Sequence, residues 1–186
     1  MHLQAKDSKI VKHEESISAD MVDQIIKYDQ ETGVFFWKHR NGFSIGDNIF
    51  NSRYADKVAG SINKHGYWRI ILNEQYVQAH RLAFFVMTGK WPSNQIDHIN
   101  GVRHDNRWCN LREATLCENA RNSCRPINNR SGFKGVSWKE RNQKWVAQIS
   151  IGNRKKHVGL FETAVEAHQA YMRAARVYHG EFARAA

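Results

Sequence analysis

The stretch QIDHINGVRHDNRWCNLREATLCENARN, residues 95–122, gathers acids, histidines and asparagines in a segment that is too polar to be a core. Asp97 and His98 are neighbours, and Asn106, Asn110 and Asn119 follow within a short distance. Such a density of carboxylate, imidazole and amide groups indicates a site for polar chemistry rather than packing.

Local signals in this stretch predict the order strand, loop, strand, helix. The expected strands are residues 96–99 and 110–112, with a turn at Asn100-Gly101. Thr115 and Glu118 form a capping box, which predicts a helix that starts there and runs to about Asn122.

These residue types suit hydrolysis of a phosphodiester, which needs a base for water, a cation for the developing charge and fixed geometry. His98 fits the base, because an unperturbed histidine pKa near ~6.5 leaves it neutral at physiological pH. Adjacent strand residues point to opposite faces, so Asp97 can serve a metal ion while His98 serves a water molecule.

A hard cation such as Mg²⁺ prefers oxygen ligands and keeps several waters. Asp97 offers a carboxylate, and Asn119 offers an amide oxygen if its helix packs across the two strands. The Asn110 amide could bridge the strands and hold the loop that follows His98. The alternative is an ordinary polar loop, because asparagine and aspartate side chains also cap turns.

Upstream of this stretch, the pattern predicts a helix capped by Ser18, a hairpin turning at Asn73-Glu74 and a helix that stops at Gly89. The expected elements are a helix over residues 18–26, strands over 34–37, 67–72 and 76–79, and a helix over 80–88. Residues 38–57 lack a pattern and are predicted to form a loop.

Downstream, the sequence changes character. Three strands are predicted at GVSW, KWVAQISI and RKKHVGLF, followed by a helix that begins at the capping box of Thr163 and Glu166 and ends near Gly180. Ala167, Tyr171, Ala174 and Tyr178 are expected on its buried face.

Charge is concentrated at the C-terminal end. The chain has 28 Lys and Arg against 18 Asp and Glu, a net charge of +10, and residues 123–186 hold +8 of it. This distribution is typical of a protein that binds a polyanion such as nucleic acid. The alternative is a solvated basic face that serves solubility alone.

Composition excludes other classes. No apolar run is long enough for a transmembrane helix, and the polar N-terminus is no signal peptide, so we expect a soluble intracellular protein without membrane partners. Three unpaired cysteines, at 109, 117 and 124, argue against a disulfide framework. A zinc site formed by these thiols with His104 is an alternative use.

Several separated motifs occur in an order that resembles the HNH endonuclease family of phage and homing nucleases. They are AHRLAFFVMTG, IDHING, DNRW, NLREAT and EN, preceded by YDQETGVFFWK and AGSIN with GYWRI, and they span about residues 24–122. The resemblance implies a ββα-metal fold in which His98 is the general base, Asp97 and Asn119 bind the metal, and Asn110 is a structural asparagine of the catalytic site.

Two positions qualify this resemblance. Many family members have histidine where this chain has Asn119, and the change to an amide oxygen favours Mg²⁺ or Mn²⁺ over softer metals. His80 matches a recurrent family position, where a core or hydrogen-bonding role is expected rather than metal binding. Arg103, Arg107, Arg112 and Arg121 are candidates for contact with the DNA backbone near the cut, although surface arginines are also ordinary. Asn106 and Arg107 are expected to order their loop.

Residues 133–182 resemble an AP2 DNA-binding domain through KGV, KWVAQI, GLFETAVEAHQAY and RAA followed by HG. The resemblance implies a three-stranded sheet, packed on one helix, that enters the major groove. The expected DNA-binding residues of this sheet are Lys134, Trp138, Lys139, Arg141, Lys144, Gln148, Arg154, Lys156 and His157. Strand alternation puts Trp145 on the core face and Lys144 with Gln148 on the other. Lysine, serine or histidine replaces the usual arginine or tryptophan at several positions, so phosphate binding is expected more than base reading.

The sequence thus predicts an α+β protein: an N-terminal arm (1–17), an HNH nuclease domain (18–122), a linker (123–132) and an AP2-like domain (133–186). We expect a Mg²⁺- or Mn²⁺-dependent endonuclease of phage or homing type that nicks double-stranded DNA in a bacterial cytoplasm, as a monomer or weak dimer. The alternative is a DNA-binding regulator with an inactive nuclease scaffold. A nuclease directed at RNA is a third, weaker reading.

Overall fold

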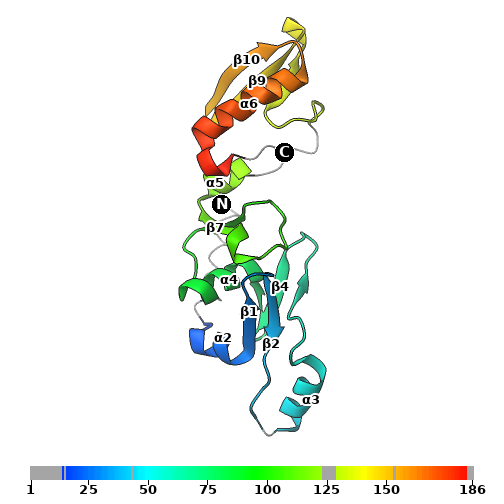
Figure 1. The fold of residues 1–186 in the computed structure, drawn as a ribbon, viewed down its shortest axis with the longest axis vertical. Coiled ribbons are helices and arrows are strands. Elements are labelled where there is room, and N and C mark those ends of the chain that lie inside the picture. The colour runs from blue at the N-terminus through cyan, green and yellow to red at the C-terminus, as the bar shows by residue number, and fades with distance from the viewer. Residues whose placement is uncertain (1–13, 15, 43, 123–128, 153, 184–186) are drawn as a thin grey trace. The chain divides into compact units, whose positions relative to one another are not determined.

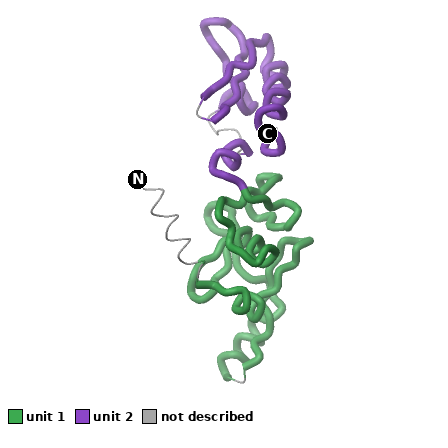
Figure 2. Tube along the Cα trace, turned by 90° about the vertical axis from the view of Figure 1, so that its left-hand side faces the viewer, with its two compact units in different colours: residues 1–113 green, residues 114–186 purple. Residues whose placement is uncertain are grey.

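The computed structural model describes residues 14, 16–42, 44–122, 129–152 and 154–183. Backbone contacts divide the chain into two compact units, residues 1–113 and 114–186 (Figures 1 and 2). Each unit combines small antiparallel sheets with helices, so the α+β class predicted from the sequence is confirmed. Over the described ranges, no helix has the length and apolarity that crossing a membrane requires.

Unit 1 begins with a capped helix and a hairpin. In α2 (Ala19–Ile25) the Ser18 hydroxyl accepts the Met21 N–H at 3.2 Å, as the sequence predicts. The chain then enters β1 (Ile26–Asp29), which pairs with β2 (Val34–Trp37).

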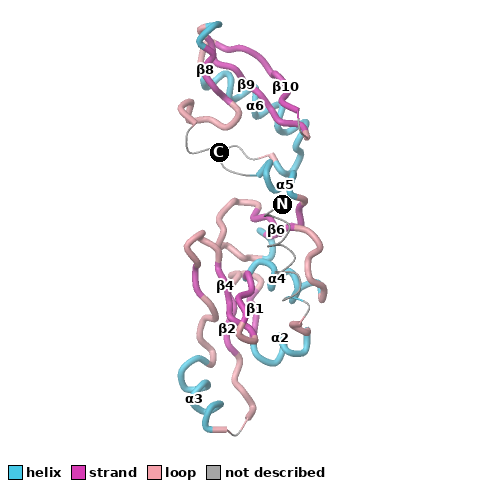
Figure 3. The backbone as a smooth tube through the Cα atoms, turned by 180° about the vertical axis from the view of Figure 1, so that it is seen from behind, coloured by secondary structure: helices cyan, strands magenta, loops and turns pink. Residues whose placement is uncertain are grey.

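The prediction of a loop over residues 38–57 is wrong, because α3 (Ile45–Tyr54) lies within it. The Ser44 hydroxyl caps this helix by accepting the Asp47 N–H at 3.0 Å. No residue of α3 is buried, and the helix lies at one end of the unit, apart from the other helices (Figure 3). A helix without a buried stripe leaves no apolar periodicity in the sequence, so the pattern gave no signal.

The central hairpin and helix agree with prediction. Strands β3 (Ser61–Ile62), β4 (Trp68–Leu72) and β5 (Gln75–Gln78) form one sheet in that order. Asn73 and Glu74 both have positive φ, 49° and 63°, as a two-residue hairpin turn requires. Helix α4 (Ala79–Thr88) follows at once and ends at Gly89, where φ is 73°.

The core of unit 1 lies among these elements, and Phe35, Ile70, Leu72 and Leu82 are its largest fully buried side chains.

The expected arm does not extend to residue 17, because Ile17 is a buried member of this core. Glu14 is also buried, and its carboxylate accepts two hydrogen bonds, at 2.6 and 2.7 Å, from the Arg81 guanidinium of α4. Burial of a paired carboxylate fixes this end of the arm against the unit. Residues 1–13 and 15 lie outside the described part of the chain.

The polar stretch forms the predicted order of elements with small shifts. Strand β6 (Gln95–His98) pairs with β7 (Leu111–Ala114), and the 3₁₀ turn η1 (Trp108–Asn110) precedes β7. Helix α5 (Leu116–Asn122) starts at the predicted capping box, where Glu118 accepts the Thr115 N–H at 2.8 Å. The second strand begins one residue later than predicted, since Asn110 belongs to η1.

Within unit 2, one helix packs on one face of a three-stranded sheet (Figure 1). Strands β8 (Val136–Lys139), β9 (Lys144–Ile151) and β10 (Arg154–Phe161) lie in the order β10-β9-β8, and the 3₁₀ turn η2 (Glu140–Asn142) joins the first two. Helix α6 (Ala164–His179) has the predicted capping box and leads into η3 (Gly180–Phe182).

The buried face of α6 differs from prediction at its end. Ala167, Tyr171 and Ala175 enter the core, and Ala174 packs beside it, whereas Tyr178 is 40% exposed. Its hydroxyl and ring instead contact the Lys156 ammonium group. The helix extends beyond the apolar part of the sheet, so its last aromatic residue, Tyr178, contacts Lys156 rather than the core.

Gly33 joins the β1-β2 hairpin to the polar loop, and its replacement tests this contact. A Cβ on Gly33 would lie 2.4 Å from the Arg107 backbone nitrogen, and its φ is +74°. We expect Gly33→Ala to lower the free energy of unfolding by more than about 2 kcal/mol in chemical denaturation, because backbone strain and a clash with the backbone add.

Gly89→Ala is the matched control for Gly33→Ala. Gly89 has φ +73°, but a Cβ added there would meet no atom within 4 Å, so only backbone strain of about 1 kcal/mol applies. Equal losses in the two variants would show that the close approach to Arg107 is unimportant.

Candidate active site

His98 ends β6 and is buried, with 5% of its surface exposed. Its Nε2 lies 3.3 Å from the Asn106 side-chain oxygen, and the Asn106 amide nitrogen donates to the His104 carbonyl at 3.3 Å. Because that oxygen can only accept, this geometry places the proton of a neutral imidazole on Nε2 and the lone pair on Nδ1. The contact therefore selects the tautomer in which Nδ1 is the basic atom.

Burial lowers the pKa of His98 below its ordinary value, and the hydrogen bond to Asn106 and the charge of Asp97 oppose this shift only in part. The imidazole is thus neutral at neutral pH. A neutral imidazole with a fixed tautomer can take a proton from water, as a general base must.

Asp97 precedes His98 and is 4% exposed. Its Oδ2 accepts hydrogen bonds from the Nε and Nη2 atoms of Arg112 on β7, at 2.9 and 2.8 Å. This ion pair between neighbouring strands makes it less costly to bury the carboxylate as an anion. From the sequence Arg112 was a candidate for contact with the DNA backbone or an ordinary surface arginine, whereas the pairing of β6 with β7 brings it to Asp97.

The donors present fit a hard divalent cation. Mg²⁺ prefers carboxylate and amide oxygens as ligands, and waters complete its shell. Asn119, the second expected ligand, lies one turn into α5 in unit 2. Its joint action with Asp97 on one cation stays a prediction.

Asn110 closes the loop between His98 and β7. Its side-chain oxygen accepts the Asn100 N–H at 3.0 Å, and its amide donates to the Asp105 carbonyl at 2.7 Å. Its own carbonyl accepts the Ile99 N–H at 2.9 Å. One side chain thus ties both ends of the loop together, which is the geometry that a bridging asparagine needs.

Asp105 anchors the middle of this loop. It accepts hydrogen bonds from the Asn100 amide at 2.7 Å and from Arg107 Nε at 2.8 Å, and the hydrogen bonds of Arg107 lower the pKa of Asp105 to about 2. Arg107, expected to contact DNA, therefore pairs with Asp105 of its own loop, although about half of its side chain is exposed.

His80 and Tyr67 lie beside His98. The sequence predicted a core or hydrogen-bonding role for His80 and assigned no role to Tyr67. The His80 ring on α4 meets the His98 ring edge-on at a centroid distance of 5.0 Å, and Tyr67 lies 5.4 Å from His80 and 6.1 Å from His98. Burial lowers the pKa of His80 well below its ordinary value, so it is neutral. The family motif that contains His80 was visible in the sequence, but its contact with His98 depends on how α4 packs against β6.

Arg103 lies at the rim of this cluster. Its guanidinium stacks over Tyr67 at 5.2 Å from the ring centroid and donates to the His65 carbonyl at 2.9 Å. The side chain is exposed, so a phosphate contact is compatible with these bonds.

In unit 2 the register divides the expected DNA-binding residues between the two faces of the sheet. Trp145 packs against the core under α6, and its partner Trp138 shares that face. Arg154 and Lys156 pair with Ile151 and Ile149, so they also lie on the helix side. The opposite face carries Lys139, Lys144, Gln148 and His157.

Several expected DNA-binding residues have other partners, and the Lys144 ammonium pairs with the Glu162 carboxylate at 2.7 Å. The Lys134 ammonium donates to the Arg121 carbonyl, and Trp138 Nε1 donates to the Glu140 carboxylate at 2.6 Å. Arg141 is exposed in η2. Strand alternation could be read from the sequence, but it divided only the residues of β9, because the register of β8 and β10 was not known.

The zinc alternative finds no donor cluster in the described structure. Cys109 and Cys117 are exposed free thiols in different units, and Cys124 lies outside the described residues. Among residues 14, 16–42, 44–122, 129–152 and 154–183, no three His, Cys, Asp or Glu side chains are grouped to hold a metal ion.

Comparison with known proteins agrees with the site. A family model for the HNH endonuclease matches residues 77–121, from the end of β5 to α5. The chain therefore contains an HNH endonuclease domain. It is also 35% identical over 89 residues to Protein 3.8 of Escherichia phage T7, an alignment covering 48% of this chain and 73% of the phage protein, and it belongs to the same family as that protein. No solved structure matches the chain. The HNH match ends at residue 121 and leaves the sheet of unit 2 unassigned.

The depressed histidine pKa values predict a loss of stability in acid. The unfolded chain takes up protons near the ordinary histidine pKa of ~6.5, whereas folded His80 stays neutral at that pH. Stability should therefore be complete above about pH 6.5 and fall as the pH drops below it. We expect the Tm of unit 1 to decrease between pH 7.5 and 5.5.

The variant His80→Phe should reduce this decrease, since it removes one of the two buried imidazoles in the described part of unit 1. His39→Gln is the control, because His39 lies in the same unit with most of its side chain exposed. The same pH dependence of Tm in His80→Phe as in the wild type would contradict the role of His80.

Proposed function

We propose that the chain is a metal-dependent DNA endonuclease that nicks double-stranded DNA. The observation that carries the proposal is the buried neutral His98, whose tautomer is set by Asn106 and which lies beside the buried carboxylate of Asp97 within the HNH match. These features supply a base and an anionic cation ligand at adjacent positions.

In the proposed reaction, His98 Nδ1 accepts a proton from the attacking water while Nε2–H stays bonded to Asn106. Asp97, held by Arg112, and Asn119 would bind Mg²⁺ or Mn²⁺. When bound, the cation would stabilise the charge that develops on the phosphoryl and leaving oxygens. His80 and Tyr67 keep the His98 ring from rotating, and Asn110 keeps its loop closed.

One such site per chain supports nicking, and a break in both strands would then need a second chain or a second binding event. The homology to a phage protein supports a phage or mobile-element origin and action in a bacterial cytoplasm. Homing activity and a monomeric or weakly dimeric state are further parts of the proposal.

We further propose that unit 2 acts as an AP2-like DNA-binding module through the sheet face opposite α6. This face carries Lys139 and Lys144 on β8 and β9, with Gln148 and His157 farther along the sheet. The positive charge concentrated in residues 123–186 supports phosphate binding.

A DNA-binding regulator is the competing function, and the Asp97–Arg112 ion pair is the observation that favours it. In that reading the guanidinium would satisfy the carboxylate permanently, and the nuclease fold would serve as a scaffold. Supercoiled plasmid incubated with Mg²⁺ or Mn²⁺, with and without a chelator, separates the two. Nicking that the chelator abolishes supports the nuclease, and no nicking with any divalent metal supports the regulator.

Removal of the base should stop cleavage and spare binding. We expect His98→Ala to reduce the nicking rate at least about 100-fold, with duplex affinity within twofold of the wild type at about the same salt concentration. His104→Ala is the control, since His104 is an exposed histidine of the same loop. Parallel loss of nicking and of binding in His98→Ala would reject the catalytic role.

Loss of the orienting amide should have a smaller effect. We expect Asn106→Ala to lower kcat by about 10- to 100-fold with little change in KM, because the imidazole loses the acceptor that fixes its tautomer. Asn106→Asp keeps an acceptor and should retain more activity than Asn106→Ala. If the two variants were equally impaired, the hydrogen bond to Nε2 would not be the reason for the loss.

The two faces of the unit 2 sheet should respond differently to loss of one charge. We expect Lys139→Gln to weaken duplex binding at every sequence and to reduce the slope of log affinity against log salt by about 1. Lys156→Gln, on the α6 side, should leave both quantities unchanged. Fluorescence anisotropy over a salt series measures them, and the reverse order would place DNA on the other face.

A further inference from the structure

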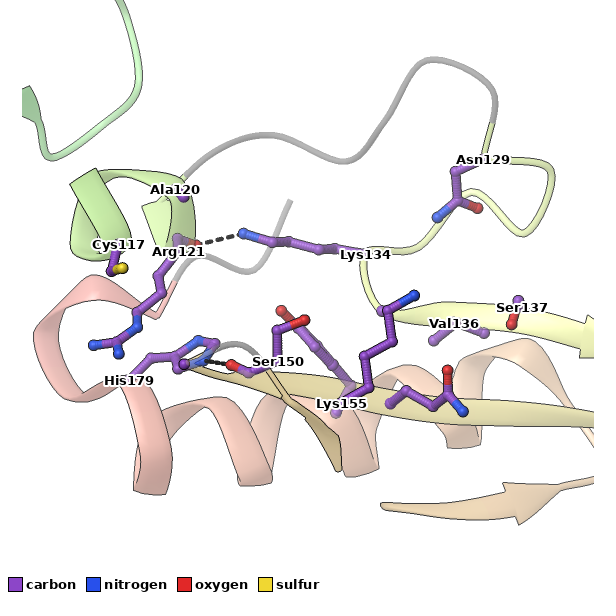
Figure 4. A pocket seen from close by; sticks show the side chains of 14 residues that line it. Cys117, Ala120, Arg121, Asn129, Lys134, Val136, Ser137, Ser150, Lys155 and His179 are labelled. Atoms are coloured by element: carbon purple, nitrogen blue, oxygen red, sulfur yellow. Dashed lines mark hydrogen bonds between the residues drawn. The ribbon is translucent and has the colours of Figure 1, made fainter. Parts of the chain in front are cut away.

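Unit 2 contains a cavity that the proposed cleavage reaction does not use, although Cys117, Ala120 and Arg121 of its lining lie within the HNH match. It has a volume of about 500 Å³ and lies between α5, the segment before β8, the sheet and the C-terminal end of α6 (Figure 4). Every described residue that lines it belongs to unit 2. Its volume is in the range of pockets that hold small organic ligands, about 300 to 1,000 Å³.

The charge of the cavity lining is of one sign. Arg121 of α5, Lys134 before β8 and Lys155 of β10 line it, and none of the described lining residues is acidic. Figure 4 shows Arg121 reaching from α5 toward His179, and Lys155 rising from the sheet. A lining with three cations and no described acidic residue favours a bound anion.

Two of these cations are available to a ligand. Lys134 is engaged by the Arg121 carbonyl, where it ties α5 to the start of the sheet. The Arg121 guanidinium and the Lys155 ammonium form no ion pair with any residue of the described structure. They come from segments far apart in sequence, so the fold alone brings them to one cavity.

Neutral hydrogen-bonding groups complete the lining. Gln148 and Ser150 alternate along β9, and Ser150 pairs with Lys155 across to β10, so all three share the face opposite α6. Ser137 adds another hydroxyl, whereas the Asn129 amide already bonds to Ser131 and Phe133. A free phosphate would use the cations but leave most of the space and these groups unfilled. A nucleotide matches both, with its phosphate at the cations and its base at the Gln148 amide.

We propose that this cavity binds a single nucleotide through its terminal phosphate, with Arg121 and Lys155 as the phosphate ligands. A terminal phosphate carries nearly two negative charges at neutral pH, against one for a phosphate inside a strand. The same chemistry is offered by a free mononucleotide and by the 5′-phosphorylated end of a DNA strand. The site does not depend on cleavage, since none of its lining residues belongs to the proposed catalytic set.

The free thiol of Cys117 lines the cavity and allows a direct test on the full chain. The chain is alkylated with N-ethylmaleimide in the presence of 2′-deoxyadenosine 5′-monophosphate at ten times its measured Kd, and mass spectrometry measures the extent of alkylation. Alkylation of Cys117 should slow about tenfold, because at this concentration about nine tenths of the cavities hold the nucleotide. Cys109, exposed in unit 1, is the internal control and should react at an unchanged rate.

Calorimetric titration with the same nucleotide tests the cations. Arg121→Gln and Lys155→Gln should each weaken binding by at least about tenfold. Arg173→Gln, which removes the same charge from an exposed position on α6, should bind as the wild type does. His98→Ala should also bind normally, so a failure of the nuclease proposal would leave this result intact.

Protection of Cys117 by other compounds distinguishes a strand end from a free nucleotide and tests the need for a terminal phosphate. Protection by a 5′-phosphorylated oligonucleotide at lower concentration than by the mononucleotide identifies a strand end as the ligand, and the reverse order identifies the free nucleotide. Protection by neither overturns the proposal. Equal protection by deoxyadenosine, or by blunt duplex without terminal phosphate, overturns it as well, because the terminal phosphate would then be irrelevant. If Arg173→Gln weakened nucleotide binding as much as Arg121→Gln and Lys155→Gln, the positive charge of unit 2 in general would explain the binding, and the proposal would be overturned.

Discussion

The candidate site depends on the side chain of Asn110. One amide group accepts from Asn100 and donates to Asp105, and the Asn110 carbonyl accepts from Ile99. These bonds draw a loop of about ten residues closed between β6 and β7. Because the loop is closed in this way, Asn106 returns to His98 and Arg112 lies across from Asp97. An amide suits the position since it donates and accepts at once, which a carboxylate or a hydrocarbon cannot do.

Around this loop, unit 1 buries polar groups at a cost that must be offset. Asp97 is offset by a guanidinium, and Glu14 by another, whereas His80 and His98 remain neutral because burial lowers their pKa. The result is an imidazole and a carboxylate that are adjacent in sequence but differ in environment. One is a neutral base whose tautomer is fixed, and the other is an anion held by an arginine. This division suits a reaction in which base and cation must act from separate positions.

Unit 2 uses its charge differently. Its cations lie on the sheet surface and around a cavity rather than in buried pairs, although Lys144 forms an exposed ion pair with Glu162. The register decides which cations face outward. Lys139 and Lys144 lie opposite each other on β8 and β9, whereas Lys156 lies one residue out of phase with Lys155 and reaches the Tyr178 ring instead. A shift of one residue in β10 would exchange these roles, because strand side chains alternate between faces.

The sequence by itself determined most of the elements and the identity of the polar stretch. Hairpin turns at Asn73-Glu74, caps at Ser18 and Thr163, and the helix stop at Gly89 are local signals, since each depends on backbone geometry within a few residues. The residue types at 97, 98 and 110 likewise carry their chemistry wherever they fold. Helix α3 was missed because an unburied helix has no apolar period.

Tertiary structure alone decided which atoms meet. The contact of His80 with His98, the pairing of Arg112 with Asp97 and the tautomer set by Asn106 all join residues whose distance in space is fixed by packing and strand register. The same holds for Arg121 and Lys155, which no sequence pattern relates.

Local interactions determine the type of each element, but long-range contacts determine the environment of each side chain, and with it the pKa and the partner.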